Sequence, residues 1–175
     1  MAKGPNYVVG YRRKRNGKTN YKERLNLLKS GRSRVVIRKS NRHATAQVVD
    51  YKDGGDVVIA SSHSSELEKF GWSHGGGNIP ASYLTGLLCG LRANSKGVKK
   101  AILDMGLSPS VKGNRIYSVL RGVQEGGIKI PVDEKIAPSE ERIHGKHISD
   151  YRKDDRIAKE FKQAKEKIMK SLSKS

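Results

Sequence analysis

The sequence contains a single cysteine and no long apolar run. Cys89 has no partner for a disulfide within the chain, which predicts an intracellular protein, and we interpret it as a small core residue. No apolar stretch approaches the roughly 18 residues that a membrane helix needs. The first residues also lack the hydrophobic segment of a secretory signal. We therefore expect a soluble cytoplasmic protein.

Acidic residues are scarce as well. The chain carries 36 Lys and Arg residues against 17 Asp and Glu residues, a formal net charge of +19. Such an excess makes a compact chain repel itself unless a polyanion neutralises it. Nucleic acid is the usual partner of such a protein, and an anionic membrane is the less favoured alternative. Residues 1–34 contain eleven basic residues and one acidic residue, which predicts a basic arm in front of an ordinary globular domain.

Glycine and proline interrupt residues 1–18, and no apolar period is sustained there, so we expect no helix in this segment. The basic run Arg12–Arg15 follows Tyr7 and Tyr11. Cations bind phosphates, and tyrosine rings stack on bases or riboses. We interpret the segment as an arm that becomes ordered on nucleic acid; the alternative is a disordered, solvated tail.

A short helix is expected after the arm. Thr19 is a suitable N-cap for it, and Gly31 is a suitable end. Tyr21, Leu25 and Leu28 share one face of this helix. We expect that face to dock on a sheet while the basic side faces a partner.

Residues 34–51 are typical of a β-hairpin, because two β-branched runs flank a short polar break. Residues 56–61 supply a third apolar run after a turn that contains two glycines. We therefore expect a three-stranded antiparallel meander. Its first tip is cationic and would meet a polyanion; the charged or titratable residues there are Arg38, Lys39, Arg42 and His43.

A helix and a strand are expected to complete the sheet. Pro80 fits the first turn of a helix over residues 80–96, in which Gly86 and Gly90 would let the helix lie close to the sheet. The nearly continuous apolar run 100–105 predicts a strand covered on both faces. Strand, helix and strand would then form a right-handed crossover unit.

Two further amphipathic helices are predicted by their apolar spacing. One covers residues 116–123 and is closed by two glycines. The other covers residues 152–172 and has a face composed mostly of lysine, as in a helix that is solvated or lies along a phosphate backbone. The polar, glycine-rich residues 61–79 are expected to form a loop, with Trp72 packed in the core.

The sequence contains no recognisable catalytic constellation. The best enzymatic alternative is a nuclease, in which Asp50, Asp56 and Asp104 near strand ends would hold magnesium. However, Asp50 and Asp56 flank a turn, where aspartate is common for backbone hydrogen bonding alone. A DNA-compacting protein is another alternative, since it would explain the charge.

Several segments, in one order along the chain, together resemble a known family. The chain is similar to the archaeal-type large-ribosomal-subunit protein eighteen, whose eukaryotic counterpart is large-subunit protein five. The carrying segments are YRRKRNGKTNYKERL (11–25), RVVIRKSNRHATAQVVD (34–50), FGWSHGGGNIPASYLTGLLCGLRA (70–93), AILDMGL (101–107), RIYSVLRGVQEGGIKIP (115–131) and PSEERIHGKHISDY (138–151).

The resemblance implies a non-enzymatic protein of the large ribosomal subunit. It would bind 5S rRNA and attach it to the large-subunit rRNA in the central protuberance, among neighbouring ribosomal proteins and without a cofactor, metal or small-molecule substrate. It also implies that the long C-terminal extension of the eukaryotic members is missing. The rRNA-binding residues implied by the matching segments are Arg12, Arg13, Lys14, Arg15, Lys18, Thr19, Tyr21, Arg24, Arg38, Lys39, Ser40, Asn41, Arg42 and His43.

The expected fold class is α/β. It consists of the antiparallel three-strand meander, a crossover strand and helices packed on the sheet, and the resemblance implies a ribonuclease H-like topology. We expect three parts: a basic arm with its short helix at 1–32, a globular core at 33–131, and a C-terminal extension with a basic amphipathic helix at 132–175.

Overall fold

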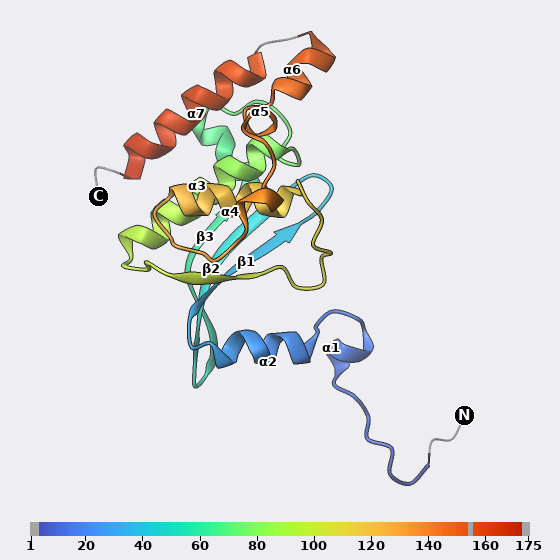
Figure 1. Cartoon of the computed structure of the whole chain (residues 1–175). Helices are drawn as coiled ribbons and strands as arrows, with labels where there is room; N and C mark the ends of the chain where they lie inside the picture. Colours follow the sequence, from blue (N-terminus) through green and yellow to red (C-terminus); the bar gives the residue numbers. More distant parts are fainter. Residues whose placement is uncertain (1–3, 154–155, 173–175) are drawn as a thin grey trace.

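The computed structural model describes residues 4–153 and 156–172 (Figure 1). The remaining residues of the expected arm (1–3) and C-terminal extension (154–155 and 173–175) lie outside the described part. The elements in chain order are α1 (Arg12–Arg15), α2 (Tyr21–Lys29), β1 (Ser33–Lys39), β2 (Ala44–Lys52), β3 (Gly55–His63), the 3-10 helix η1 (Ser64–Phe70), α3 (Ile79–Ser95), β4 (Ala101–Asp104), α4 (Arg115–Glu125), the 3-10 helix η2 (Glu134–Ile136), α5 (Glu140–Ile143), α6 (Lys146–Arg152) and α7 (Arg156–Leu172).

Four strands form one sheet in the order β3-β2-β1-β4. β1 and β2 pair antiparallel, as do β2 and β3, whereas β4 pairs parallel with β1. The expected α/β class is confirmed, and the likeness to ribonuclease H remains a prediction. Among the residues that the structure describes, no helix is both long and apolar enough to cross a membrane.

One face of the sheet forms the main core. Alternation buries Val35 and Ile37 of β1 in this core, together with Val48 of β2, which pairs with Val35. α3 and α4 cover this face, whereas α2 and the arm lie on the other side of the sheet (Figure 1). β4 is an edge strand with half-buried Ile102 and Leu103, so the expected full covering of this strand is wrong.

α3 begins as the sequence indicates but makes a different close contact. The Asn78 side chain caps it by accepting the N–H of Ala81 at 2.8 Å. Gly86 and Gly90 face α4 rather than the sheet, since a Cβ at either position would collide with the α4 backbone at Val119 or Val123. The expectation that these glycines serve the sheet is therefore wrong, because periodicity does not specify which element a small residue faces.

A second apolar cluster joins α7 to α3. The expected amphipathic face is buried at Ile157, Phe161, Ala164 and Ile168, and the cluster includes Trp72, as predicted. The helix expected over residues 152–172 is α7, which begins at Arg156; residue 152 instead ends α6, and Lys153 after it adopts a left-handed conformation with φ of 53°.

The segment expected to be a loop, 61–79, contains regular structure at its start. β3 continues to His63, and η1 follows directly. His63 begins η1 with a capping box, since its Nδ1 accepts the Ser65 N–H at 3.2 Å and its own N–H donates to Glu66 at 2.8 Å. The sequence did not predict this cap, because a segment rich in serine, histidine and glycine is typical of a loop.

The close contact between α3 and α4 leads to a stability prediction. Gly86→Ala should lower the free energy of unfolding by about 1–3 kcal/mol, because overpacking against the Val119 backbone outweighs the gain in helix propensity. Denaturant unfolding would measure the change. Gly54→Ala is the control, because a Cβ there meets nothing within 4 Å. Equal effects at the two sites would contradict this account of the helix contact.

Candidate nucleic-acid interface

The basic run of the arm forms the single helical turn α1, contrary to the expectation that residues 1–18 contain no helix. All four of its side chains are exposed. Arg13 donates from Nε to the Thr19 hydroxyl at 2.8 Å, which ties the turn to the chain before α2. Thr19 is therefore not the N-cap of α2. Asn20 caps it instead, accepting the N–H groups of Lys22 and Glu23.

α2 does not dock through its apolar stripe. None of its residues is buried, and Leu25 is 54% exposed. The helix is instead fixed by a polar contact: Arg24 Nη2 lies 2.8 Å from Asp56 Oδ2 at the start of β3. At the other end, Tyr21 packs on Tyr11 of the arm with ring centroids 5.1 Å apart. The basic residue expected to face a partner thus also anchors the helix.

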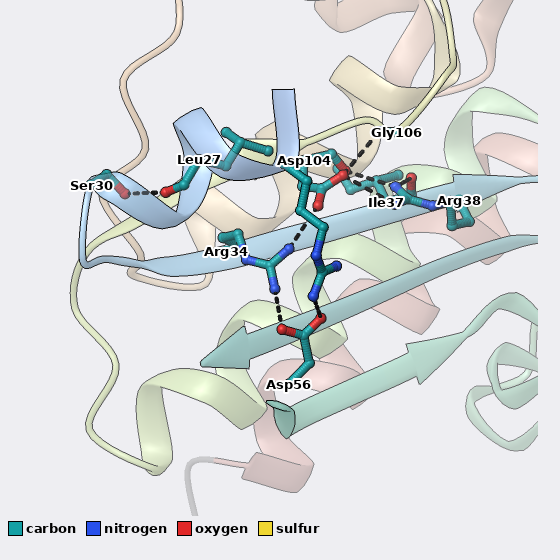
Figure 2. A network of polar contacts seen from close by, with 9 residues as sticks. Leu27, Ser30, Arg34, Ile37, Arg38, Asp56, Asp104 and Gly106 are labelled. Carbon is teal, nitrogen blue, oxygen red and sulfur yellow. Dashed lines mark hydrogen bonds and ion pairs between the residues drawn. The ribbon is translucent and has the colours of Figure 1, made fainter. Parts of the chain in front are cut away.

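A buried arginine lies at the centre of this anchor. The Arg34 side chain is 1% exposed and bridges two carboxylates, reaching Asp56 at 2.7 Å and Asp104 at 3.0 Å (Figure 2). Asp104 also accepts from Arg38 at 3.0 Å and from the Gly106 N–H at 2.9 Å. Arginines and aspartates therefore alternate from α2 across β3 and β1 to β4.

Two of the three carboxylates considered for a nuclease belong to this network. Arginine donors occupy the oxygens of Asp56 and Asp104, and Asp50 lies further along β2, opposite Val57 of β3. The guanidinium groups at these positions would repel a metal cation. Within the described part of the chain, no group of three or more His, Cys, Asp or Glu residues is placed to hold a metal ion. The arrangement fits ion pairing.

The charge of the network changes the titration of Asp56. Partial burial acts to raise its pKa, but hydrogen bonds from Arg24 and Arg34, together with their positive charges, outweigh burial and lower the pKa below its ordinary value. The carboxylate is therefore held in its charged form, which both arginines require. Burial dominates at Cys89, where it raises the thiol pKa to about 11, as expected of an inert core residue.

A groove of about 1370 Å³ lies between the arm and α2 on one side and β4 with its following loop on the other. We call it the arm groove. Six of the fourteen residues expected to bind rRNA line it: Arg13, Lys18, Thr19, Tyr21, Arg24 and Arg38. Arg12, Lys14 and Arg15 are exposed on α1 outside this lining.

The loop at 105–110 forms one wall of the arm groove and was missed as part of the site. Leu107 on this wall is 55% exposed. The segment AILDMGL (101–107) predicted a strand followed by a turn, but the sequence does not show that this strand pairs with β1. Only that pairing places the loop beside Arg38, whose guanidinium also donates to the Asp104 carbonyl at 2.9 Å.

No residue of the hairpin tip, Lys39–His43, lines the arm groove. Residues at the start of α4 hold the tip in place. Arg115 donates to the Ser40 carbonyl at 3.0 Å, and the Lys39 ammonium donates to Asn114 at 3.2 Å. His43 contacts Ser64 at 3.1 Å. Asn41 and Arg42 are exposed. The tip is therefore a fixed turn that presents these two side chains to solvent.

The lowered pKa of Asp56 predicts how stability depends on pH. A carboxyl with a depressed folded-state pKa contributes stability that is complete above its unfolded pKa and is lost as pH falls through the folded value. Wild type should therefore lose more stability than Asp56→Asn as pH decreases from about 5 to about 2. Denaturant unfolding across this range would measure it.

Asp53→Asn is the control for this series. Asp53 is exposed in the turn before β3 and forms no ion pair within the described part of the chain. A difference between wild type and Asp56→Asn that stays constant over the whole pH range would contradict the ion-pair assignment.

Comparisons with known proteins identify the family. Residues 5–99 match the family model described as ribosomal large subunit proteins 60S L5 and 50S L18. The chain is 50% identical to the large ribosomal subunit protein uL18 of Korarchaeum cryptofilum over 86% of this chain and 77% of the relative. It is 46% identical to the uL18 protein of Methanobrevibacter smithii over 92% of this chain and 85% of the relative.

The matched region contains the arm, the meander and α3, and the relatives extend the match over most of the C-terminal elements. The family is composed of proteins of the large ribosomal subunit, which agrees with an excess of exposed basic residues around a sheet. The chain therefore belongs to the archaeal-type uL18 branch of the ribosomal L5 and L18 protein family.

Proposed function

We propose that this protein is a non-catalytic constituent of the large ribosomal subunit that binds 5S rRNA. It would attach that RNA to the large-subunit rRNA in the central protuberance, in the cytoplasm and beside neighbouring ribosomal proteins. The observation that supports this most is the arm groove, where basic residues from the arm, α2 and β1 converge. A groove of this size accommodates a segment of RNA backbone, and its walls supply cations for phosphates.

The arm groove combines two kinds of cation. Arg24 and Arg38 are held by Asp56 and Asp104, so their remaining donors are oriented before RNA binds. Arg13 and Lys18 belong to an arm in which no described residue is buried, and this arm would become ordered against the RNA. Tyr21, stacked on Tyr11, offers an aromatic surface for a base or ribose.

The hairpin tip would supply a second, rigid contact with the same RNA. Its backbone is fixed by Arg115 and by the loop that contains Gly77, where a Cβ would collide with the Asn41 carbonyl. Arg42 lies at the tip without a side-chain ion pair or hydrogen bond among the described residues. Because the backbone of the turn is already fixed, only the Arg42 side chain must become ordered when its guanidinium binds phosphate.

Removal of residues 1–18 should weaken 5S rRNA binding and leave the core folded. No residue at 4–18 is buried, so the deletion removes phosphate-binding cations without opening the core. The slope of log affinity against log salt should decrease by roughly 0.7–0.9 for each phosphate that the truncated protein no longer neutralises. Filter binding over a salt series would measure the slope. Deletion of residues 1–9, which contain only one basic residue, is the control; equal slopes in the two truncated proteins would rule out the arm as a binding element.

Arg42→Ala should reduce 5S rRNA affinity by about 1–3 kcal/mol, the usual scale of a charge-assisted hydrogen bond. Thermal stability should not change, because the side chain has no partner among the described residues. Filter binding and circular dichroism would separate the two effects. Arg152→Ala removes an equally exposed arginine from α6, far along the chain, and should have little effect. Similar losses in both variants would indicate a general charge effect instead of a contact at the tip.

A further inference from the structure

A second cationic surface lies outside the arm groove and the hairpin tip. We call it the basal hollow; it has a volume of about 560 Å³. It shares no lining residue with the arm groove, and no carboxylate of the described residues lines it. Its lining residues come from the chain before β1, the chain before β4, α4 and the segment after α4: Arg32, Lys100, Arg121, Gln124, Ile128, Lys129, Ile130 and Pro131.

Backbone pairing forces two lysines together at this surface. Lys100 and Lys129 form a parallel bridge, in which the Ala101 N–H donates to the Lys129 carbonyl at 3.1 Å and the Lys129 N–H donates to the Lys99 carbonyl at 2.9 Å. Ile128 and Ile130 are buried, so Lys129 between them must point outward. Ammonium groups side by side repel each other. An anion between them would remove that repulsion.

The cations of the basal hollow differ from those of the arm groove in their partners. Arg24, Arg34 and Arg38 are all paired with aspartates. In contrast, the side chains of Arg32, Lys100 and Lys129 are exposed and take part in no ion pair or hydrogen bond within residues 4–153 and 156–172. Glu125, at the end of α4, forms an ion pair with Lys165, in which Nζ lies 2.6 Å from Oε1. The charges of Arg32, Lys100 and Lys129 are therefore not compensated by an ion pair within the described residues.

The basal hollow also lies far from the hairpin tip. Arg32 precedes β1 and the tip follows it, so the seven residues of β1 separate them by about 23 Å. The parallel pairing of β1 and β4 places Lys100 at the same end as Arg32. The hollow therefore lies at the far end of β1 from the tip, and none of its lining residues belongs to the arm groove.

We propose that the basal hollow binds the phosphate backbone of a second RNA segment, distinct from the one held by the arm groove and the tip. This inference rests on the proposed function, and it assigns a site for the attachment to another RNA. Phosphate oxygens fit the hollow because Arg32, Lys100 and Lys129, from three separate segments, converge on one small concavity without a competing carboxylate among its described lining residues. The protein would then bridge two RNA segments, one at the arm groove and the hairpin tip and the other at the basal hollow.

The test uses the full chain bound to immobilised 5S rRNA, with a labelled RNA duplex of unrelated sequence as the second ligand. Lys100→Gln with Lys129→Gln should weaken capture of the duplex about tenfold and reduce its logarithmic salt slope by roughly 0.7–0.9 for each phosphate that is no longer neutralised. Binding of 5S rRNA itself should change less than about twofold. The control, Lys159→Gln with Lys162→Gln, removes the same charge from exposed positions of α7 and should leave capture unchanged.

Several outcomes would overturn the inference. Equal loss in the control variant would mean that net charge alone attracts the duplex. A parallel loss of 5S rRNA affinity would place the hollow within the first RNA site. Unchanged duplex capture with lost binding of an acidic peptide would identify a protein partner instead.

The inference is also separable from the proposed function. If wild type fails to bind 5S rRNA, that function is wrong, whereas direct titration of the duplex with wild type and the Lys100/Lys129 double variant still tests the hollow. Loss of duplex binding only in the double variant would support the hollow as an RNA site.

Discussion

The pairing of buried Arg34 with Asp56 and Asp104 is the interaction on which the RNA-facing side of the molecule depends. A guanidinium without counterions would not be tolerated at 1% exposure, and breaking such a buried pair typically costs about 3–5 kcal/mol. The same two carboxylates hold Arg24 and Arg38. One buried charge therefore positions α2 below the sheet, orients two arginines toward the arm groove and fixes the start of the loop after β4.

The opposite side of the sheet is organised by contact between backbones. Glycines of α3 and α4 allow these helices to approach so closely that a Cβ at Gly86 or Gly122 would collide with the facing backbone. This contact fixes α4, whose first residue, Arg115, holds the hairpin tip through the Ser40 carbonyl. α7 completes a second apolar cluster on α3. The apolar side thus supports the tip, and the ion-pair network supports the arm groove.

The basic residues of the chain consequently divide into two groups. One group is neutralised within the protein and has a structural role as well as exposed donors, as Arg24 and Arg38 show. The other group, which includes Arg42, Lys100 and Lys129, is exposed without such partners among the described residues. A net charge of +19 does not distinguish these groups. The distinction matters because an arginine held by a carboxylate binds phosphate with fixed geometry, whereas an uncompensated lysine contributes mainly charge.

The sequence by itself determined the α/β class, the strands of the hairpin, α3, α4 and the buried face of α7, because alternation and helical periodicity are local patterns. It also determined the basic arm and the family resemblance. Tertiary structure alone decided that Arg24 anchors α2, that Gly86 faces α4, and that the loop after β4 lines the groove. These features depend on which distant segments meet, and periodicity contains no information about that partner. Asp56 and Asp104 show the consequence: alone they resemble metal ligands, and only beside Arg34 do they become its counterions.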